Sequence, residues 1–303
     1  MRIGVIGLGV MGGNHLRAIR SVAGLQLACA ADLKKENRAA AARQYGIPVF
    51  PDFRSMIGQV DAVMVSTPTS DHYAISRFFL EQGKHVLVEK PISETVAQAD
   101  DLIAIAGRKK AVLAVGHLER FNPAVECLQN LVDHPRFIEV QRLGSFSPRS
   151  LDIDVILDLM IHDLDIILQW DRSGVREIRA IGIPVISPKI DIANVRLEFH
   201  SGMVAALTAS RVSQEKTRKL RIFQKDMYLS ADYKQRRVKI MKLQNRQIVE
   251  HVPEIKDIEP LVNLWTNFYR TATTGRNFNV TGEEGRDALD LAIAIGQSIG
   301  RKN

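Results

Sequence analysis

The 303-residue sequence lacks the features that mark secreted and membrane proteins. It has only two cysteines, Cys29 and Cys127, and no Cys-x-x-Cys pair, which disfavours both a disulfide scaffold and a structural zinc site. No apolar run reaches the roughly 18 residues that a membrane span needs. The apolar N-terminal stretch ends in glycines and a histidine rather than in a cleavage site. We therefore expect a cytoplasmic protein without a membrane partner.

Aromatic residues are also scarce, at 6% of the chain, whereas basic residues are in excess and give a net charge of +7. The excess is concentrated in residues 211–246, where basic side chains alternate in segments that read as strands. A solvated sheet face explains this pattern better than nucleic-acid binding, because aromatic interleaving and a recognisable nucleic-acid module are both missing. Attraction of anionic substrates is compatible with the charge.

The first 120 residues alternate short apolar strands with helices. Strands are predicted at 2–7, 25–32, 61–67, 85–90 and 111–117. Helices are predicted at 11–22, 34–45, 70–83 and 93–109. Strand–helix alternation with short loops predicts a doubly wound parallel sheet that is covered by helices on both faces.

The order of the predicted helices and strands changes from about residue 121. Helices near 123–133 and 151–171 precede a run of alternating strands from 176 to 252, and helices at 258–274 and 283–300 close the chain. Thr281 is the expected N-cap of the last helix, with Glu284 completing a capping box. We expect an α/β protein with a dinucleotide-binding domain at 1–120. A second, α+β domain at 121–303 should contain a largely antiparallel sheet for substrate binding and oligomerisation.

The segment "GLGVMG" follows the first strand and contains Gly7, Gly9 and Gly12. In a dinucleotide-binding βαβ unit, the first glycine permits the tight turn, the second admits the pyrophosphate, and the third lets helix and strand pack closely. Asp32 ends the second strand, where an acid accepts hydrogen bonds from the adenosine ribose. This pattern predicts a Rossmann domain that binds NAD, although Lys34 and Lys35 leave NADP open. A glycine turn without a ligand is the alternative.

Polar residues follow the next two strands at the carboxyl edge of the sheet, where open α/β sheets bind ligands. The segments are "VSTPTSDH" and "VEKPIS". The expected cofactor-binding residues here are Ser66, Thr67, Thr69, His72 and Glu89. Lys90 also ends a strand on this edge, and its bond to Pro91 is one that could be cis.

The segment "VILDLMIHDLDIIL" carries polar residues in an otherwise apolar helix. Asp158, His162 and Asp165 fall within about 60° of one another at 100° per residue. A helix that is apolar nearly all round is normally buried, so this stripe must face a partner or a cavity. A satisfied polar seam, a catalytic site and a metal site are all possible from the spacing, but no further cluster completes a metal sphere, so we expect no metal.

Together these motifs, with "GHLERFNP" at 116–123, resemble the two-domain dehydrogenases of the Gfo/Idh/MocA family. The resemblance runs essentially from end to end. It implies that Lys90 is catalytic and that Asp158 and His162 lie beside the substrate hydroxyl. Either His162 or Lys90 is then the base. Met160 stands where the family commonly has glycine, so its side chain is expected to reshape the substrate pocket.

Among family members, "VILDLMIHDLD" and "RFNP" are most similar to bacterial enzymes that oxidise the 3-hydroxyl of UDP-N-acetylglucosamine. The resemblance therefore implies an NAD-dependent dehydrogenase of a nucleotide sugar and a homodimer or homotetramer. Arg120, Asn122 and Asp165 are the expected substrate-binding residues, and Arg142 and Arg149 are further candidates for a diphosphate. The alternatives are a dehydrogenase of a free polyol or sugar, such as an inositol, and a non-catalytic NAD(P)-binding regulator.

Overall fold

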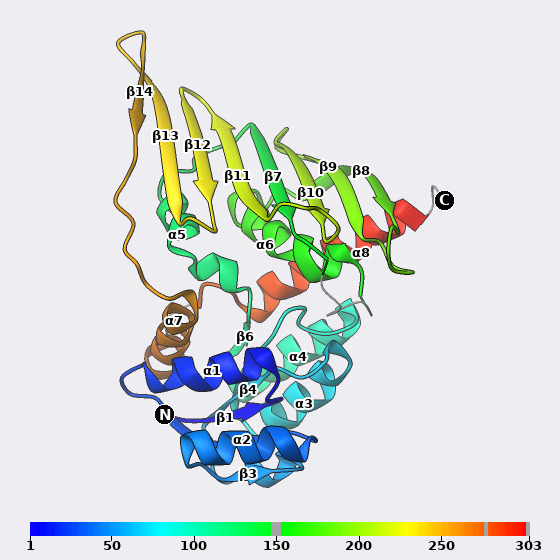
Figure 1. The fold of residues 1–303 in the computed structure, drawn as a ribbon, viewed down its shortest axis with the longest axis vertical. Coiled ribbons are helices and arrows are strands. Elements are labelled where there is room, and N and C mark those ends of the chain that lie inside the picture. The colour runs from blue at the N-terminus through cyan, green and yellow to red at the C-terminus, as the bar shows by residue number, and fades with distance from the viewer. Residues whose placement is uncertain (147–152, 276–277, 301–303) are drawn as a thin grey trace. The chain divides into compact units, whose positions relative to one another are not determined.

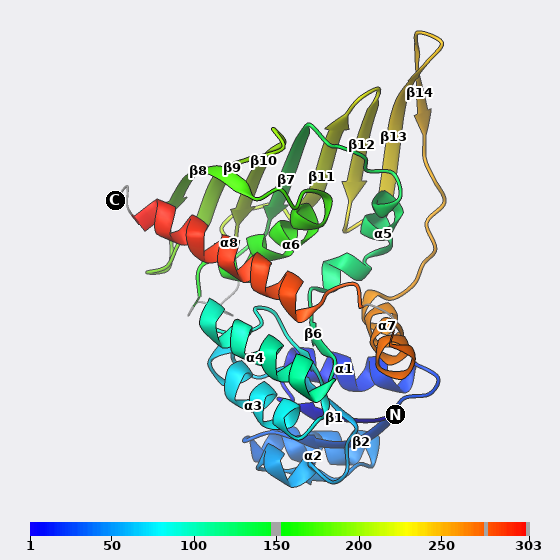
Figure 2. The ribbon, with the colours of Figure 1, turned by 180° about the vertical axis from the view of Figure 1, so that it is seen from behind.

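The computed structural model describes residues 1–146, 153–275 and 278–300 (Figures 1 and 2). The chain forms two compact units. Unit 1 consists of Met1–Phe121 and Ile258–Arg286, and unit 2 consists of Asn122–Asp257 and Asp287–Asn303. Unit 1 therefore includes a late segment of the chain in addition to its first 121 residues. In the described residues, every helix is too short or too polar to cross a membrane.

Unit 1 contains a six-stranded parallel sheet in the order β3-β2-β1-β4-β5-β6. Its strands are β1 (Arg2–Ile6), β2 (Gln26–Ala31), β3 (Val49–Phe50), β4 (Ala62–Val65), β5 (His85–Val88) and β6 (Leu113–Val115). Every residue of β4 and β6 is buried, as expected for strands covered on both faces. The strand order reverses between β1 and β4, and ligands of doubly wound sheets bind outside the carboxyl ends of strands at such a point.

Four helices connect these strands, and a fifth joins unit 1 from near the end of the chain. They are α1 (Val10–Arg20), α2 (Lys35–Tyr45), α3 (Thr69–Glu81), α4 (Val96–Lys109) and α7 (Pro260–Thr274). Helices α3 and α4 pack together, and α7 lies beside α1 (Figures 1 and 2). The 3-10 turns Phe53–Met56 and Leu118–Phe121 complete the unit. The predicted doubly wound parallel sheet is confirmed; only the two-residue β3 escaped prediction.

Unit 2 contains an eight-stranded sheet in the order β14-β13-β12-β11-β7-β10-β9-β8. Its strands are β7 (Phe137–Leu143), β8 (Val175–Ile183), β9 (Ile192–Phe199), β10 (Val204–Ser210), β11 (Thr217–Gln224), β12 (Met227–Asp232), β13 (Arg237–Gln244) and β14 (Gln247–His251). The pairing is antiparallel throughout except between β7 and β10, which run parallel. The predicted, largely antiparallel sheet is confirmed. The prediction missed β7, which stands inside the sheet.

The helices of unit 2 cover one face of this sheet (Figures 1 and 2). They are α5 (Pro123–Gln129), α6 (Ile161–Trp170) and α8 (Gly282–Gly300), whose residues from Asp287 onward belong to unit 2. Their apolar residues form one core with the inward residues of β7 to β13. The capping box at the start of α8 is confirmed within unit 1, since Glu284 N donates to Thr281 Oγ1 (3.3 Å) and Thr281 N donates to Glu284 Oε2 (3.1 Å).

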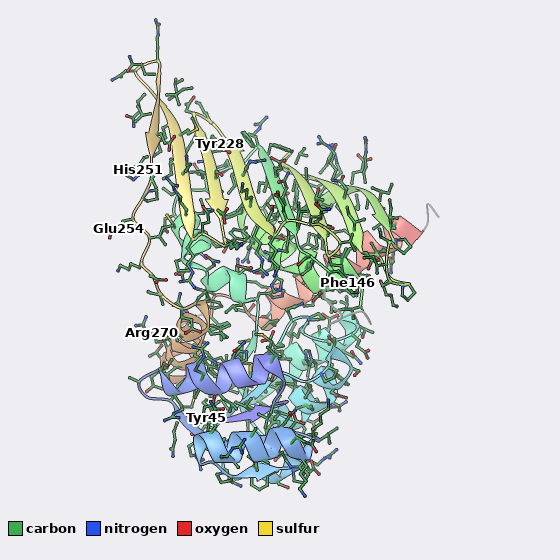
Figure 3. The ribbon with its side chains drawn as sticks, viewed as in Figure 1. Tyr45, Phe146, Tyr228, His251, Glu254 and Arg270 are labelled. Atoms are coloured by element: carbon green, nitrogen blue, oxygen red, sulfur yellow. The ribbon has the colours of Figure 1, made fainter. Side chains whose placement is uncertain are left out.

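The opposite face of the unit 2 sheet bears no helix among the described residues. An aromatic group lies on it, with ring centroids 5.7 Å apart for Phe137 and Phe223 and 4.9 Å apart for Phe223 and Tyr228. Tyr228 is labelled in Figure 3. Basic side chains alternate along β11 on this face, as predicted, with Lys219 exposed and Arg221 half-buried. This face is amphipathic and open within the chain.

Candidate active site

The glycine turn between β1 and α1 has the geometry that its sequence predicts. Gly7 has a φ of +84°, which favours glycine, and a Cβ there would lie 2.6 Å from the carbonyl oxygen of Ser66. A Cβ on Gly12 would lie 1.9 Å from the Gly7 carbonyl oxygen, so helix and turn meet too closely for any side chain. A Cβ on Gly9, by contrast, would have no described heavy atom within 4 Å. One glycine therefore faces open space, and two serve packing.

Asp32 is held rigidly at the end of β2. Its Oδ2 accepts hydrogen bonds from Leu8 N (2.6 Å) and from Asn37 Nδ2 (3.1 Å), while its Oδ1 accepts one from Lys34 N (2.7 Å). Arg38 is folded back, with its Nη1 donating to the carbonyl oxygens of Asp32 and Leu33 at 2.8 Å each. The carboxylate is thus oriented by the backbone of both neighbouring turns.

A cavity of about 680 Å³ opens at this edge of the unit 1 sheet. Five of the predicted cofactor-binding residues line it: Gly7, Gly9, Asp32, Ser66 and Thr67. The volume is typical of a small-molecule site. These residues suit NAD, because Gly9 leaves room for a pyrophosphate at the N-terminus of α1 and Asp32 offers acceptor oxygens for the ribose hydroxyls. The residues present therefore fit the dinucleotide.

The polar residues after β4 mainly hold the loops of this edge in place. Ser66 Oγ donates to the Gly7 carbonyl oxygen (2.7 Å), and Thr69 begins α3. His72 is 1% exposed, and its ring nitrogens lie 2.8 Å from the Pro91 oxygen and 3.0 Å from the Thr67 oxygen. Burial lowers the pKa of His72, whereas the two carbonyl oxygens oppose this shift. The ring lies between the loops after β4 and β5. His72 thus contacts both loops, and its predicted contact with the cofactor stays a prediction.

The residues after β5 include the predicted catalytic lysine. Lys90 follows the strand by two positions, and its bond to Pro91 is cis, as its sequence allowed. Glu89 accepts a hydrogen bond at Oε1 from His15 Nε2 (2.9 Å), and His15 Nδ1 accepts one from Trp265 Nε1 (3.0 Å). The sequence had not marked His15 or Trp265. A histidine on the inner face of the helix after the glycines was the available signal for His15, whereas no local signal connects Trp265 to it.

His117 follows β6, directly beside β5 in the sheet, and is completely buried. Burial, together with the positive charges of Arg120 and Lys90, lowers the pKa of His117 to about 3. Its imidazole is therefore neutral at physiological pH. A neutral ring at this position adds no positive charge next to Lys90.

The polar helix of unit 2 departs from a regular α-helix. Residues Ile156–Met160 form a π-helical segment, and α6 begins only at Ile161. Asp154 Oδ1 accepts hydrogen bonds from Ile156 N (3.0 Å) and Leu157 N (2.9 Å), which fixes the start of the segment. The predicted helix began at residue 151, and residues 151 and 152 lie outside the described residues. Such π segments occur frequently at functional sites.

Asp158 lies in this π segment, and His162 and Asp165 lie on α6. Asp158 and His162 are half-buried, and Asp165 is 3% exposed. The side chains of Asp158 and His162 are therefore partly accessible to solvent, whereas that of Asp165 is enclosed by protein. Within the described ranges, no group of three His, Cys, Asp or Glu side chains is arranged to hold a metal ion.

The predicted substrate-binding arginines have protein partners. Arg142 donates to Asp163 through Nε (2.6 Å) and Nη2 (2.9 Å), and both side chains are buried. Arg120 lies 3.0 Å from Glu284 and donates to the Asn279 carbonyl oxygen (2.6 Å). Carboxylates therefore balance both guanidinium charges, and the predicted contacts with a diphosphate stay predictions. Arg149 lies outside the described residues.

Asn122 likewise has a structural role. Its Oδ1 accepts a hydrogen bond from Ala124 N (3.1 Å) and caps α5, while its Nδ2 donates to the Tyr233 carbonyl oxygen (3.3 Å). The side chain is 6% exposed. Asparagine is among the preferred N-cap residues, so "FNP" reads here as a helix start with proline at its first position. The predicted contact with substrate stays a prediction.

Comparison with known proteins identifies the family. Residues 1–117 match the family described as "Oxidoreductase family, NAD-binding Rossmann fold". The UDP-N-acetylglucosamine 3-dehydrogenase of Acidithiobacillus ferrooxidans is 41% identical over 234 residues, which cover 77% of this chain and 74% of that enzyme. A solved structure of that enzyme superposes with a TM-score of 0.95 and 35% identity, covering 99% of this chain and 98% of that chain. The myo-inositol 2-dehydrogenase of Thermotoga maritima is 26% identical and covers 100% of this chain and 97% of its own.

The glycine turn, the oriented Asp32 and the cavity are thus those of an NAD site. The chain belongs to the Gfo/Idh/MocA family and is an NAD-binding oxidoreductase that acts on a CH–OH group.

Proposed function

We propose that this protein is a nucleotide-sugar dehydrogenase that oxidises the 3-hydroxyl of UDP-N-acetylglucosamine, or of a closely related nucleotide sugar, to the ketone. The observation that carries the proposal is the similarity to the enzyme that acts on this substrate, at 41% identity over 234 residues and a TM-score of 0.95 over nearly the whole chain. The inositol dehydrogenase is similar over the whole chain as well, but only at 26% identity.

The proposed chemistry divides between a proton acceptor and a cation. Oxidation of an alcohol removes a proton from the hydroxyl and a hydride from its carbon, and NAD, when bound, supplies the hydride acceptor. His162 takes the proton, and Asp158, one turn earlier, orients the imidazole and stabilises its cation. The ammonium of Lys90 stabilises negative charge that develops on the substrate oxygen. The reverse assignment, with Lys90 as base and His162 as relay, uses the same groups.

Two features of the structure support these assignments. Lys90 follows β5 at the carboxyl edge of the unit 1 sheet, the edge at which the NAD cavity opens. In unit 2, the Arg142–Asp163 ion pair joins β7 to α6 immediately beside His162, which fixes the helix that carries the proposed base. A buried, bidentate arginine–carboxylate pair has a specific geometry, so it sets orientation as well as charge balance.

The enzyme is further proposed to form an oligomer and to reside in the cytoplasm. The open, amphipathic face of the unit 2 sheet, with Phe137, Phe223 and Tyr228, supports a homodimer or homotetramer formed through that face. The cofactor and a nucleotide sugar are both cytoplasmic metabolites, so we place the enzyme in the cytoplasm. A non-catalytic regulator is disfavoured because Lys90, Asp158 and His162 are all present.

A substrate panel tests the proposal. Purified protein with NAD is offered UDP-N-acetylglucosamine, UDP-N-acetylgalactosamine, UDP-glucose, free N-acetylglucosamine and myo-inositol, and NADH formation is followed at 340 nm. The highest kcat/KM is expected for UDP-N-acetylglucosamine, with one NADH formed per keto sugar. A higher kcat/KM for myo-inositol or a free sugar would replace the proposal with a polyol or sugar dehydrogenase. NAD binding without turnover of any substrate would favour the regulator.

A further inference from the structure

A buried chain of three side chains ends at the residue before Lys90. Trp265 on α7 donates from Nε1 to Nδ1 of His15 on α1 (3.0 Å), and His15 Nε2 lies 2.9 Å from Glu89 Oε1. Trp265 and His15 are each 0% exposed, and the Glu89 side chain is 14% exposed. All three belong to unit 1. Of the three, only Glu89 has a role above, as a predicted cofactor-binding residue, and the contacts with His15 and Trp265 are not used there.

The geometry fixes which ring nitrogen of His15 carries the proton. An indole Nε1–H is only a donor, so His15 Nδ1 must be the acceptor and is unprotonated. The proton of the neutral ring therefore lies on Nε2, which donates to Glu89 Oε1. The edge-on contact of the two rings, with centroids 5.9 Å apart and planes at 83°, holds this arrangement. His15 consequently presents a fixed donor to the Glu89 carboxylate.

Glu89 is also confined from its other side. A Cβ on Gly116 would lie 3.3 Å from Glu89 Oε2, Cδ and Cα, so Gly116 leaves just enough room for the carboxylate. Gly116 N donates to the Val88 carbonyl oxygen (2.7 Å), which joins the ends of β5 and β6. Among the described residues, Glu89 Oε2 accepts no hydrogen bond from the protein. The carboxylate is therefore held by one oxygen, while the other remains available.

This carboxylate follows β5, in the half of the sheet that takes the nicotinamide nucleotide. A dinucleotide lies across the two halves of a doubly wound sheet. The glycine turn and Asp32 lie on the first half, where they would hold the adenosine and pyrophosphate parts. The nicotinamide ring carries a positive charge only in its oxidised form. A fixed negative charge near it stabilises NAD⁺ relative to NADH, and a positive charge does the opposite.

We propose that Glu89 biases the cofactor site toward NAD⁺ by its charge, and that His15 is a positioning residue that holds Glu89 for this purpose. Lys90, next in the chain, opposes this bias, and Glu89 offsets its charge. The bias favours binding of the oxidised cofactor before alcohol oxidation and release of NADH afterwards. The inference rests on NAD binding and not on the identity of the sugar.

The test measures cofactor binding without any sugar, by calorimetric titration of the full-length protein with NAD⁺ and with NADH. Glu89→Gln keeps the shape and an acceptor oxygen for His15 but removes the charge. Its Kd ratio, NAD⁺ over NADH, is expected to rise on the order of tenfold. Glu81→Gln, which neutralises an exposed carboxylate at the far end of α3 from this edge, is the matched control and should leave the ratio unchanged.

Two substitutions of His15 separate its two hydrogen bonds. In His15→Gln the amide reaches the place of Nε2 and can donate to Glu89, whereas in His15→Asn it reaches only the place of Nδ1, near Trp265. We expect His15→Asn to raise the ratio several-fold and His15→Gln to restore it. An unchanged ratio in Glu89→Gln would overturn the charge effect. Equal ratios in His15→Asn and His15→Gln would overturn the positioning role, even if Glu89→Gln behaves as expected.

Because no sugar is present, failure of UDP-N-acetylglucosamine as a substrate leaves this result intact. Conversely, an unchanged Kd ratio leaves the substrate panel intact. Thermal unfolding of each variant accompanies the titrations. If His15→Asn does not fold, the comparison of Glu89→Gln with Glu81→Gln still decides the charge effect. The Kd ratio of His15→Gln then decides whether a donor at the place of Nε2 is sufficient to hold Glu89.

Discussion

Two glycines of the same turn should respond in opposite ways to an added methyl group. Gly9 has φ −67° and ψ −161°, which any residue can adopt, and a methyl group added there would meet no described atom within 4 Å. The free energy of unfolding of Gly9→Ala should therefore lie within about 1 kcal/mol of the wild-type value, because that is the cost of an alanine at a helix N-cap. The methyl would enter the space proposed for the pyrophosphate. Loss of one backbone hydrogen bond to a charged group corresponds to roughly ten- to hundredfold weaker NAD binding.

Gly12→Ala should instead destabilise the fold. Its Cβ would lie 1.9 Å from the Gly7 carbonyl oxygen, and a backbone oxygen cannot move aside as a flexible side chain can. Overpacking of this kind costs about 1–3 kcal/mol, which lowers the melting temperature of a domain of this size by roughly 2–12 °C. The higher helix propensity of alanine offsets only a part of the loss.

Thermal unfolding and calorimetric NAD titration of both variants measure the two effects separately. Gly9→Ala should lose affinity for NAD without losing stability, and Gly12→Ala should lose stability. A Gly9→Ala protein that binds NAD as tightly as the wild type would show that the pyrophosphate does not approach this glycine. A Gly12→Ala protein of unchanged stability would show that α1 does not pack against the turn as described.

Four further outcomes are expected. NAD should bind at least about thirtyfold more tightly than NADP, because a 2′-phosphate would face the fixed carboxylate of Asp32; equal or tighter NADP binding would mean that a neighbouring lysine overrides it. Lys90→Ala and His162→Ala should each lower kcat by roughly a hundred- to thousandfold or more while NAD affinity is kept; near-normal turnover would reject the assignment, and loss of folding in His162→Ala would favour a structural polar seam. Turnover should survive dialysis against EDTA, and chelator-sensitive turnover with a stoichiometric metal would overturn the mechanism. The pKa of His117 is about 3 in the fold and near 6.5 in the unfolded chain, so the unfolded state takes up a proton first on acidification. The free energy of unfolding should therefore fall below about pH 6.5, by up to about 1.4 kcal/mol per pH unit. Urea titrations at several pH values should show a shallower slope for His117→Gln.

Local patterns predicted much of unit 1. The glycine turn, the acid at the end of β2 and the buried strands all depend on residues close together in the sequence, and their spacing has a direct steric meaning. Strand β7 was not predicted, although burial alternates strictly along Phe137–Leu143, in step with the alternation of "FIEVQRL".

Long-range partners were beyond local patterns. Arg142 and Arg120 read as cations available for a diphosphate, because nothing near them in the sequence indicates Asp163 or Glu284 as partners. The π segment at Ile156–Met160 could not be anticipated either, since apolar spacing alone is compatible with a regular helix. Roles that depend on a distant partner therefore needed the three-dimensional structure.

The contact between Trp265 and His15 joins residues that are 250 positions apart, which has a consequence for how the protein folds during synthesis. The first 121 residues of unit 1 leave the ribosome long before Ile258–Arg286, which completes the unit. At about 5–20 residues per second, the intervening 136 residues, Asn122–Asp257, take roughly 7 to 27 s to make. During that interval the nascent nucleotide-binding unit lacks α7. The face of α1 that packs against α7, and the side chain of His15, therefore lack the contacts that this late helix supplies.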